Sequence, residues 1–160
     1  ASGGPFFGYT SEMLRDVTLE KTLAHPTWNM GAKITVDSAT LMNKGFEVIE
    51  VVHLFGVRPE QVNVVVHRES IIHSAVEYID NSIIAQMSVP DMRHCVQYAL
   101  SHPERCEATT HELDLFEVGK LTFARPDTDN FVLLAKAYIA RWCGTRCTQC
   151  GKRRSRCGIS

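Results

Sequence analysis

The side chains best suited to chemistry are concentrated in one short stretch of the chain. Ser38 and Thr40 are expected at the start of a helix, where unpaired N–H groups and the positive end of the helix dipole favour anions. Asn43, Lys44 and Glu47 follow, and positions three and four apart share one face of a helix. This set suits a small phosphorylated ligand beside a divalent cation, with Glu47 as an oxygen ligand. On spacing alone, a capped helix with a solvated polar face is the more common explanation.

The elements that must position these residues are short helices and strands. The clearest boundaries are Asp91, a helix N-cap candidate, Gly56, a helix stop, and the turn at residues 80–82 between two apolar runs. Periodicity and boundaries predict helices at residues 18–24, from 37–40 to 55, 92–101 and 131–141, and strands at 32–36, 62–66, 75–79 and 83–87. The expected fold class is α+β, a mixed sheet with helices packed on one side.

The composition is that of a globular domain. Hydrophobic residues make up 44% and charged residues 22%, which excludes a disordered chain. No apolar run reaches the roughly 20 residues that span a bilayer, and no secretory signal opens the chain. The missing initiator Met and a start inside a Gly-rich loop indicate a piece of a longer protein. In the first 141 residues only Cys95 and Cys106 are cysteines, as in a reduced cytoplasmic domain.

Several longer motifs run through the first 141 residues. They are Ser-Gly-Gly-Pro-Phe at residues 2–6, His-Pro-Thr-Trp-Asn-Met-Gly at 25–31, Lys-Ile-Thr-Val-Asp-Ser-Ala-Thr at 33–40, Met-Asn-Lys-Gly at 42–45 with Glu47, Ser-Ile-Ile-His-Ser at 70–74 after His67, Pro-Asp-Met-Arg at 90–93, and Leu-Thr-Phe at 121–123 with Pro-Asp at 126–127. In order and spacing this set resembles the catalytic-domain signature of the 1-deoxy-D-xylulose 5-phosphate reductoisomerase family. The resemblance covers about residues 1–141.

The resemblance implies a substrate site. The residues that would bind phosphate and hydroxyl groups are Ser2, Ser38, Asn43 and Lys44. His25, Trp28 and Met30 would belong to a substrate-binding loop that folds over the ligand, so that Trp28 excludes water.

The resemblance also implies which residues act in catalysis. Glu47, Lys44 and His73 would be the catalytic residues, and Glu47 would be one of three carboxylates that hold Mg²⁺ or Mn²⁺. Met92 would pack against the nicotinamide of NADPH. From the residues alone, a satisfied sheet histidine is the favoured interpretation of His73. Trp28 also fits a core aromatic, and Met92 fits core filler.

The activity that the resemblance implies is a rearrangement and reduction. 1-Deoxy-D-xylulose 5-phosphate would be converted to 2-C-methyl-D-erythritol 4-phosphate in non-mevalonate isoprenoid precursor synthesis, with the metal polarising oxygens and NADPH supplying the hydride. The implied setting is cytoplasmic. The implied partners are a phosphorylated sugar substrate and a second copy in a homodimer, without nucleic acid or membrane.

The resemblance divides the chain into parts of two domains. Residues 1–116 would belong to a catalytic domain truncated at its N-terminus, 117–130 to a connector, and 131–141 to the first helix of a truncated C-terminal helical domain. The NADPH-binding domain and two further metal-binding carboxylates would precede Ala1, so the chain alone is expected to be inactive.

The chain departs from the family pattern at a few positions. Arg68 and Glu69 replace Pro and Gln in a His-Pro-Gln-Ser motif, a change expected to alter a turn near the site. Asn81 stands where Gly is common, and Asn also tolerates a left-handed turn conformation. Phe7 stands where a basic residue is common.

Residues 142–160 differ from the rest of the chain. They contain five Lys/Arg, no acidic residue and four cysteines, Cys143, Cys147, Cys150 and Cys157. One interpretation is a small zinc-binding, nucleic-acid-binding module. The preferred interpretation is a frame-shift, because permitted codons read one base later give Pro-Asn-Ala-Ala-Asn-Glu, a segment this family carries here. Sequencing the DNA around the Arg141 codon separates the two.

Overall fold

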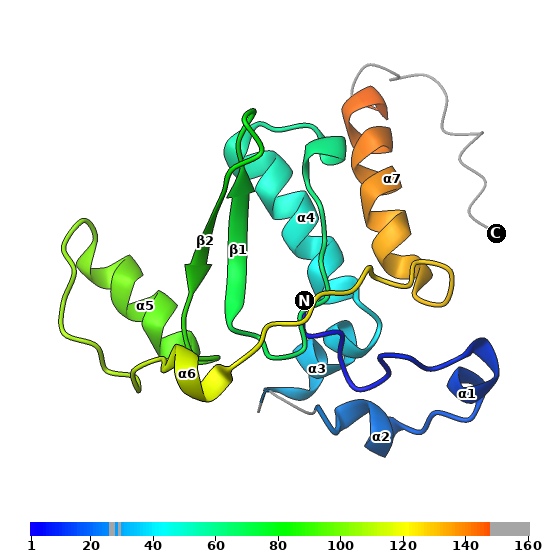
Figure 1. Ribbon diagram of the computed structural model, residues 1–160. Coiled ribbons are helices and arrows are strands. Elements are labelled where there is room, and N and C mark those ends of the chain that lie inside the picture. Colours follow the sequence, from blue (N-terminus) through cyan, green and yellow to red (C-terminus); the bar gives the residue numbers. More distant parts are fainter. Residues whose placement is uncertain (26–27, 29, 148–160) are drawn as a thin grey trace.

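The computed structural model describes residues 1–25, 28 and 30–147, with side chains up to residue 139 (Figure 1). The elements are α1 (Ser11–Arg15), α2 (Leu19–Leu23), α3 (Ala32–Ala39), α4 (Met42–Phe55), the 3₁₀ helix η1 (Pro59–Gln61), β1 (Ile72–Glu77), β2 (Ile83–Met87), α5 (Met92–Ser101), α6 (Leu115–Val118) and α7 (Val132–Cys147). The predicted α+β class is confirmed. The sheet of the described residues is an antiparallel pair, β1–β2, rather than the mixed sheet expected.

Helices α4 and α7 pack side by side (Figure 1). Gly45 permits this close approach, because a Cβ at this position would lie 2.9 Å from the Cβ of Ala137. Leu134 of α7 is fully buried. The other members of its core cluster are Phe6, Ala39, Leu41, Val48 and Phe131. The first loop, α4 and α7 therefore share one core.

The strand predicted at residues 32–36 is wrong, because these residues form the first turns of α3. Three β-branched residues favour a strand locally. Thr35, however, is buried, and its hydroxyl donates to the Gly31 carbonyl at 2.9 Å inside the helix. Helix α3 also packs against α2 and α4, so packing overrides local propensity.

This correction changes the position of Ser38 and Thr40. Both lie at the C-terminal end of α3, where Thr40 is the C-cap, rather than at a helix N-terminus. The argument from a helix dipole therefore does not apply to them. The chain then turns at Leu41, whose N–H donates to the Ser38 carbonyl at 3.1 Å, and α4 starts at Met42. The end of α4 at Gly56, in a left-handed conformation with φ 64°, is as predicted.

The predicted hairpin is confirmed as β1–β2, although β1 begins three residues earlier than expected. Asn81 has φ 64° in the connecting turn, the conformation for which Asn is a suitable replacement for Gly. The strand predicted at residues 62–66 is wrong. Within it only Val66 pairs, in a single bridge with Ala124. The apolar run instead packs Val62 and Val64 against the core.

Helix α5 spans the predicted residues, and the Asp91 carboxylate accepts the Arg93 N–H at 2.9 Å. Residues 102–131 are irregular apart from α6 and the isolated bridge at Ala124. Helix α7 begins at Val132, one residue after the start of the helix predicted at 131–141, and continues to Cys147. The cysteine side chains of the tail and all of residues 148–160 lie outside the described part, so both interpretations of the tail stay predictions.

No helix among the described residues is long and apolar enough to cross a membrane.

Candidate substrate site

Three polar side chains from separate segments meet at the end of α3, and we call them the anion cluster: Ser2, His25 and Ser38. The Nε2 atom of His25 lies 3.0 Å from Ser38 Oγ and 3.4 Å from Ser2 Oγ. All three residues are partly buried. Two hydroxyls and an imidazole directed at one point can donate hydrogen bonds to the oxygens of an anion.

Two glycines allow the backbone after Ser2 to approach the end of α3. Gly3 and Gly4 have φ values of 86° and 65°, a region that L side chains rarely adopt. A Cβ on Gly4 would lie 2.7 Å from the Ser38 carbonyl oxygen, so a side chain at this position would push the loop away from α3. We call residues 2–4 the Ser2–Gly4 loop. Its Gly-Gly pair is required for the convergence of the two hydroxyls.

The tautomer of His25 follows from its neighbours. The backbone N–H of Trp28 donates to Nδ1 at 2.9 Å, so the proton of the neutral ring sits on Nε2. Nε2 then donates to Ser38 Oγ. Burial of the ring, and then the positive charge of Arg68, lower the pKa of His25 below its ordinary value of 6.5. The ring is therefore neutral at pH 7.

A titration of the His25 ring by NMR should give a midpoint below 6.5. The pKa of His25 is lower in the folded chain than in the unfolded chain. At pH values between these two pKa values, the unfolded chain therefore binds more protons than the folded chain. The stability contributed by this group therefore rises with pH through that interval, is complete above 6.5, and is lost as the pH falls toward the folded pKa. A midpoint at or above 6.5 would contradict the assigned burial and tautomer.

A second group lies on the first turns of α4, and we call it the α4 polar face: Asn43, Lys44 and Glu47. The Asn43 amide donates to one Glu47 oxygen at 3.1 Å, and Lys44 Nζ lies 2.6 Å from the other. The Glu47 side chain is 43% exposed and that of Lys44 is 22% exposed, so the carboxylate remains accessible.

The two groups adjoin each other at the start of the chain. Burial, and then the charge of Lys44, lower the pKa of the Ala1 amine to about 5, while Glu47 acts in the opposite direction. The residue next to Ser2 thus lies beside the α4 polar face. The Ser2–Gly4 loop, His25, α3 and α4 together present two hydroxyls, an imidazole, an ammonium and a carboxylate.

Trp28 and His73 also meet. Their ring centroids are 6.4 Å apart in an edge-to-face arrangement, and the Trp28 indole N–H donates to Ser70 Oγ at 3.3 Å. His73 Nε2 lies 3.0 Å from the Ser88 carbonyl. Met92, at the start of α5, is 62% exposed.

Sequence reasoning gave no role to Ser70 or Arg68. Ser70 is buried, with φ 55°, and Arg68 Nη1 donates to the carbonyls of Ser2 and Gly4. In the sequence, Arg68 was noted only as a replacement in the expected His-Pro-Gln-Ser motif, and that replacement could have pointed to a local role.

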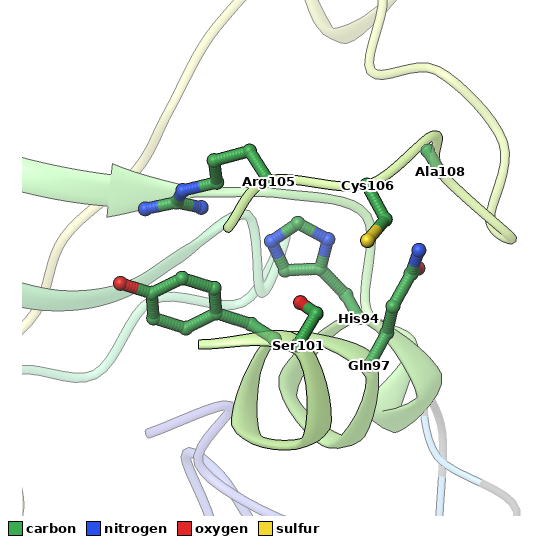
Figure 2. A pocket seen from close by; sticks show the side chains of 7 residues that line it. His94, Gln97, Ser101, Arg105, Cys106 and Ala108 are labelled. Atoms are coloured by element: carbon green, nitrogen blue, oxygen red, sulfur yellow. The ribbon is translucent and has the colours of Figure 1, made fainter. Parts of the chain in front are cut away.

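A separate hollow lies beside α5 (Figure 2). Its lining residues are His94, Gln97, Tyr98, Ser101, Arg105, Cys106 and Ala108. The guanidinium of Arg105 lies 4.1 Å from the centroid of the Tyr98 ring, as a cation–π pair. None of the predicted site residues lines this hollow.

Two family profiles match the chain. One, described as the 1-deoxy-D-xylulose 5-phosphate reductoisomerase C-terminal domain, matches residues 1–55, and the other, described as the DXP reductoisomerase C-terminal domain, matches residues 87–149. The 1-deoxy-D-xylulose 5-phosphate reductoisomerase of Chlorobium chlorochromatii is 58% identical over 140 residues, which are 88% of this chain and 37% of the relative. The 1-deoxy-D-xylulose 5-phosphate reductoisomerase of Phocaeicola vulgatus is 56% identical over 140 residues, which again are 88% of this chain and 37% of the relative. The chain belongs to the 1-deoxy-D-xylulose 5-phosphate reductoisomerase family.

Solved reductoisomerases share the fold. A structure described as DOX-P reductoisomerase in complex with NADPH, fosmidomycin and magnesium has a TM-score of 0.86 and 43% identity, covering 91% of this chain and 36% of that one. The Zymomonas mobilis reductoisomerase in complex with NADPH has a TM-score of 0.79 and 42% identity, covering 87% and 35%. The predicted family is confirmed. The chain spans little more than a third of the length of its reductoisomerase relatives.

The donor set for a metal among the described residues is partial. Glu47 offers an accessible carboxylate, the hard oxygen ligand that Mg²⁺ prefers. Among the described residues no three His, Cys, Asp or Glu side chains are grouped closely enough to hold a metal ion. Glu47 fits as one ligand, and a complete coordination sphere requires further oxygens.

Proposed function

We propose that this chain is the substrate-binding part of a reductoisomerase that converts 1-deoxy-D-xylulose 5-phosphate to 2-C-methyl-D-erythritol 4-phosphate. A relative that carries this enzyme's name is 58% identical to the chain, and a solved relative is a complex with NADPH, fosmidomycin and magnesium. The reaction would require NADPH and Mg²⁺ or Mn²⁺ and would serve isoprenoid precursor synthesis.

The observation that carries this proposal is the anion cluster beside the α4 polar face. A phosphorylated sugar needs donors for a dianionic group at one end and polar groups for its hydroxyls at the other. Ser2, His25 and Ser38 supply the donors, with His25 Nε2 only 3.0 Å from Ser38 Oγ. The α4 polar face supplies the second set.

Each residue has a proposed task. Lys44 and Asn43 bind and orient substrate oxygens, and Lys44 also holds the Glu47 carboxylate in place. Trp28, joined to Ser70 and facing His73, excludes water from the reacting end. Met92 is exposed and offers an apolar surface for a nicotinamide ring.

Glu47 would hold the metal together with oxygens that the described residues do not supply. When bound, the metal polarises substrate oxygens and the nicotinamide supplies a hydride. The protein's own contribution is to fix the substrate between the anion cluster and the α4 polar face.

The setting and organisation of the whole protein are also proposals. We propose a cytoplasmic homodimer in which residues 1–116 belong to the catalytic domain, 117–130 form a connector and 131–141 begin a helical domain. The core that α7 shares with α4 would then be the contact between these parts.

Turnover by a grafted enzyme tests the proposal. Residues 1–141 replace the matching segment of a complete homologous reductoisomerase, and oxidation of NADPH is followed with substrate and Mg²⁺. We expect turnover by the grafted enzyme and none by the 160-residue chain alone. A grafted enzyme that is folded and binds NADPH but shows no turnover would refute the proposal.

A further inference from the structure

Arg68 is joined to the Ser2–Gly4 loop although more than sixty residues separate them in the chain. One guanidinium nitrogen, Nη1, donates to the Ser2 carbonyl at 3.0 Å and to the Gly4 carbonyl at 2.9 Å. The guanidinium carbon also lies 5.2 Å from the centroid of the Phe7 ring. Arg68 thus contacts the loop on both sides of Gly3.

These contacts restrain a part of the backbone that has little rigidity of its own. Gly3 and Gly4 lack side chains and adopt left-handed conformations, so the loop can take many other shapes when free. The space beside Gly4 is closed by the Ser38 carbonyl, which a Cβ at this position would meet at 2.7 Å. Holding the carbonyls of Ser2 and Gly4 therefore restrains the loop that presents the Ser2 hydroxyl to His25.

The charge of Arg68 is also available to a ligand. Among the described residues no carboxylate lies within ion-pair distance of its guanidinium. The neighbouring Glu69 binds Thr122 instead, accepting its N–H at 3.2 Å and its hydroxyl at 2.7 Å. The field of Arg68 reaches the anion cluster, because it contributes to the lowered pKa of His25.

We propose that Arg68 is a positioning residue of the anion cluster, which fixes the Ser2–Gly4 loop through two carbonyls and adds attraction for a phosphate group bound there. The identity of the ligand as a phosphate rests on the proposed function.

The test is a titration of the 160-residue chain with inorganic phosphate, followed by NMR of the loop amides and of the His25 ring. R68Q should weaken phosphate binding about tenfold, the effect of losing one partly screened charge. It should also shift the amides of Gly3 and Gly4 and raise the pKa of His25. R68K keeps the charge, so it should leave the pKa of His25 near that of the parent chain and weaken phosphate binding less than R68Q does.

The matched control is R58Q, which removes an arginine from an exposed site at the start of η1. It should leave phosphate binding and the His25 pKa unchanged. The proposal is overturned if R68Q binds phosphate within about twofold of the parent chain, a difference under 0.5 kcal/mol, or if R58Q has an equal effect. If R68Q does not fold, R68K decides through phosphate affinity and the loop amides. If neither folds, Arg68 is a folding residue and the proposal is overturned.

This titration needs neither metal nor nicotinamide. Phosphate binding that depends on Arg68, combined with an inactive grafted enzyme, would refute the proposed reaction and leave the role of Arg68 intact. An active grafted enzyme, combined with phosphate binding that R68Q does not change, would refute the role of Arg68 and leave the proposed reaction intact.

Discussion

In the grafted enzyme, Glu47→Gln should lower kcat/KM by about 100-fold or more. Gln keeps the size of the side chain and an acceptor for Asn43 and Lys44, but it removes the charge that a divalent cation requires. The Mg²⁺ concentration for half-maximal rate should rise as well. Steady-state kinetics at several Mg²⁺ concentrations measures both effects.

The matched control is Glu50→Gln, an exposed carboxylate on the same helix. It should leave kcat/KM and the Mg²⁺ dependence unchanged. Glu47→Gln should also leave the melting temperature nearly unchanged, because a partly exposed ion pair contributes about 0–1 kcal/mol. Equal losses in the two variants, or full activity of Glu47→Gln at low Mg²⁺, would remove Glu47 from the proposed metal site.

In the chain itself, His67→Ala should reduce the free energy of unfolding by about 2–4 kcal/mol. The ring is 3% exposed. Nδ1 lies 2.9 Å from the Thr122 carbonyl, and Nε2 accepts the Ile71 N–H at 3.2 Å. The ring also stacks on Phe123 with centroids 5.0 Å apart. Alanine would leave buried polar groups without partners and open a cavity, as urea unfolding would show.

His67→Phe separates the two contributions. It keeps the stacking on Phe123 and loses both hydrogen bonds, so its stability should fall between those of the parent chain and His67→Ala. Leu54→Ala, at a position 78% exposed near the end of α4, is the control and should change stability by less than about 0.5 kcal/mol. A loss of stability at His67 no larger than that at Leu54 would show that the contacts of His67 with residues 122 and 123 do not stabilise the fold.

Local signals predicted those elements whose boundaries are set by their own residues. Asp91 caps α5 with its side chain, and Gly56 ends α4 in a left-handed conformation that glycine adopts more easily than other residues. The β1–β2 hairpin follows from its turn, where Asn81 takes a left-handed conformation. In each case the decisive interaction lies within a few residues of the signal.

The predictions that failed depend on distant contacts. Thr35 and its β-branched neighbours are helical because α3 packs between α2 and α4. The run at residues 62–66 does not form a strand because only Ala124 pairs with it, at Val66. The same limit applies to the site. Motifs named Ser2, His25 and Ser38, but the two carbonyl contacts of Arg68 became visible only once the fold had placed them together.

The central claim is that the anion cluster and the α4 polar face form one substrate site. Hydrogen–deuterium exchange of the grafted enzyme, with and without 1-deoxy-D-xylulose 5-phosphate, tests it most directly. We expect the substrate to slow exchange in residues 1–6 and 36–48, and to leave residues 94–108 around the hollow beside α5 unchanged. Protection confined to residues 94–108, or no protection in residues 1–6 and 36–48 at saturating substrate, would contradict the claim.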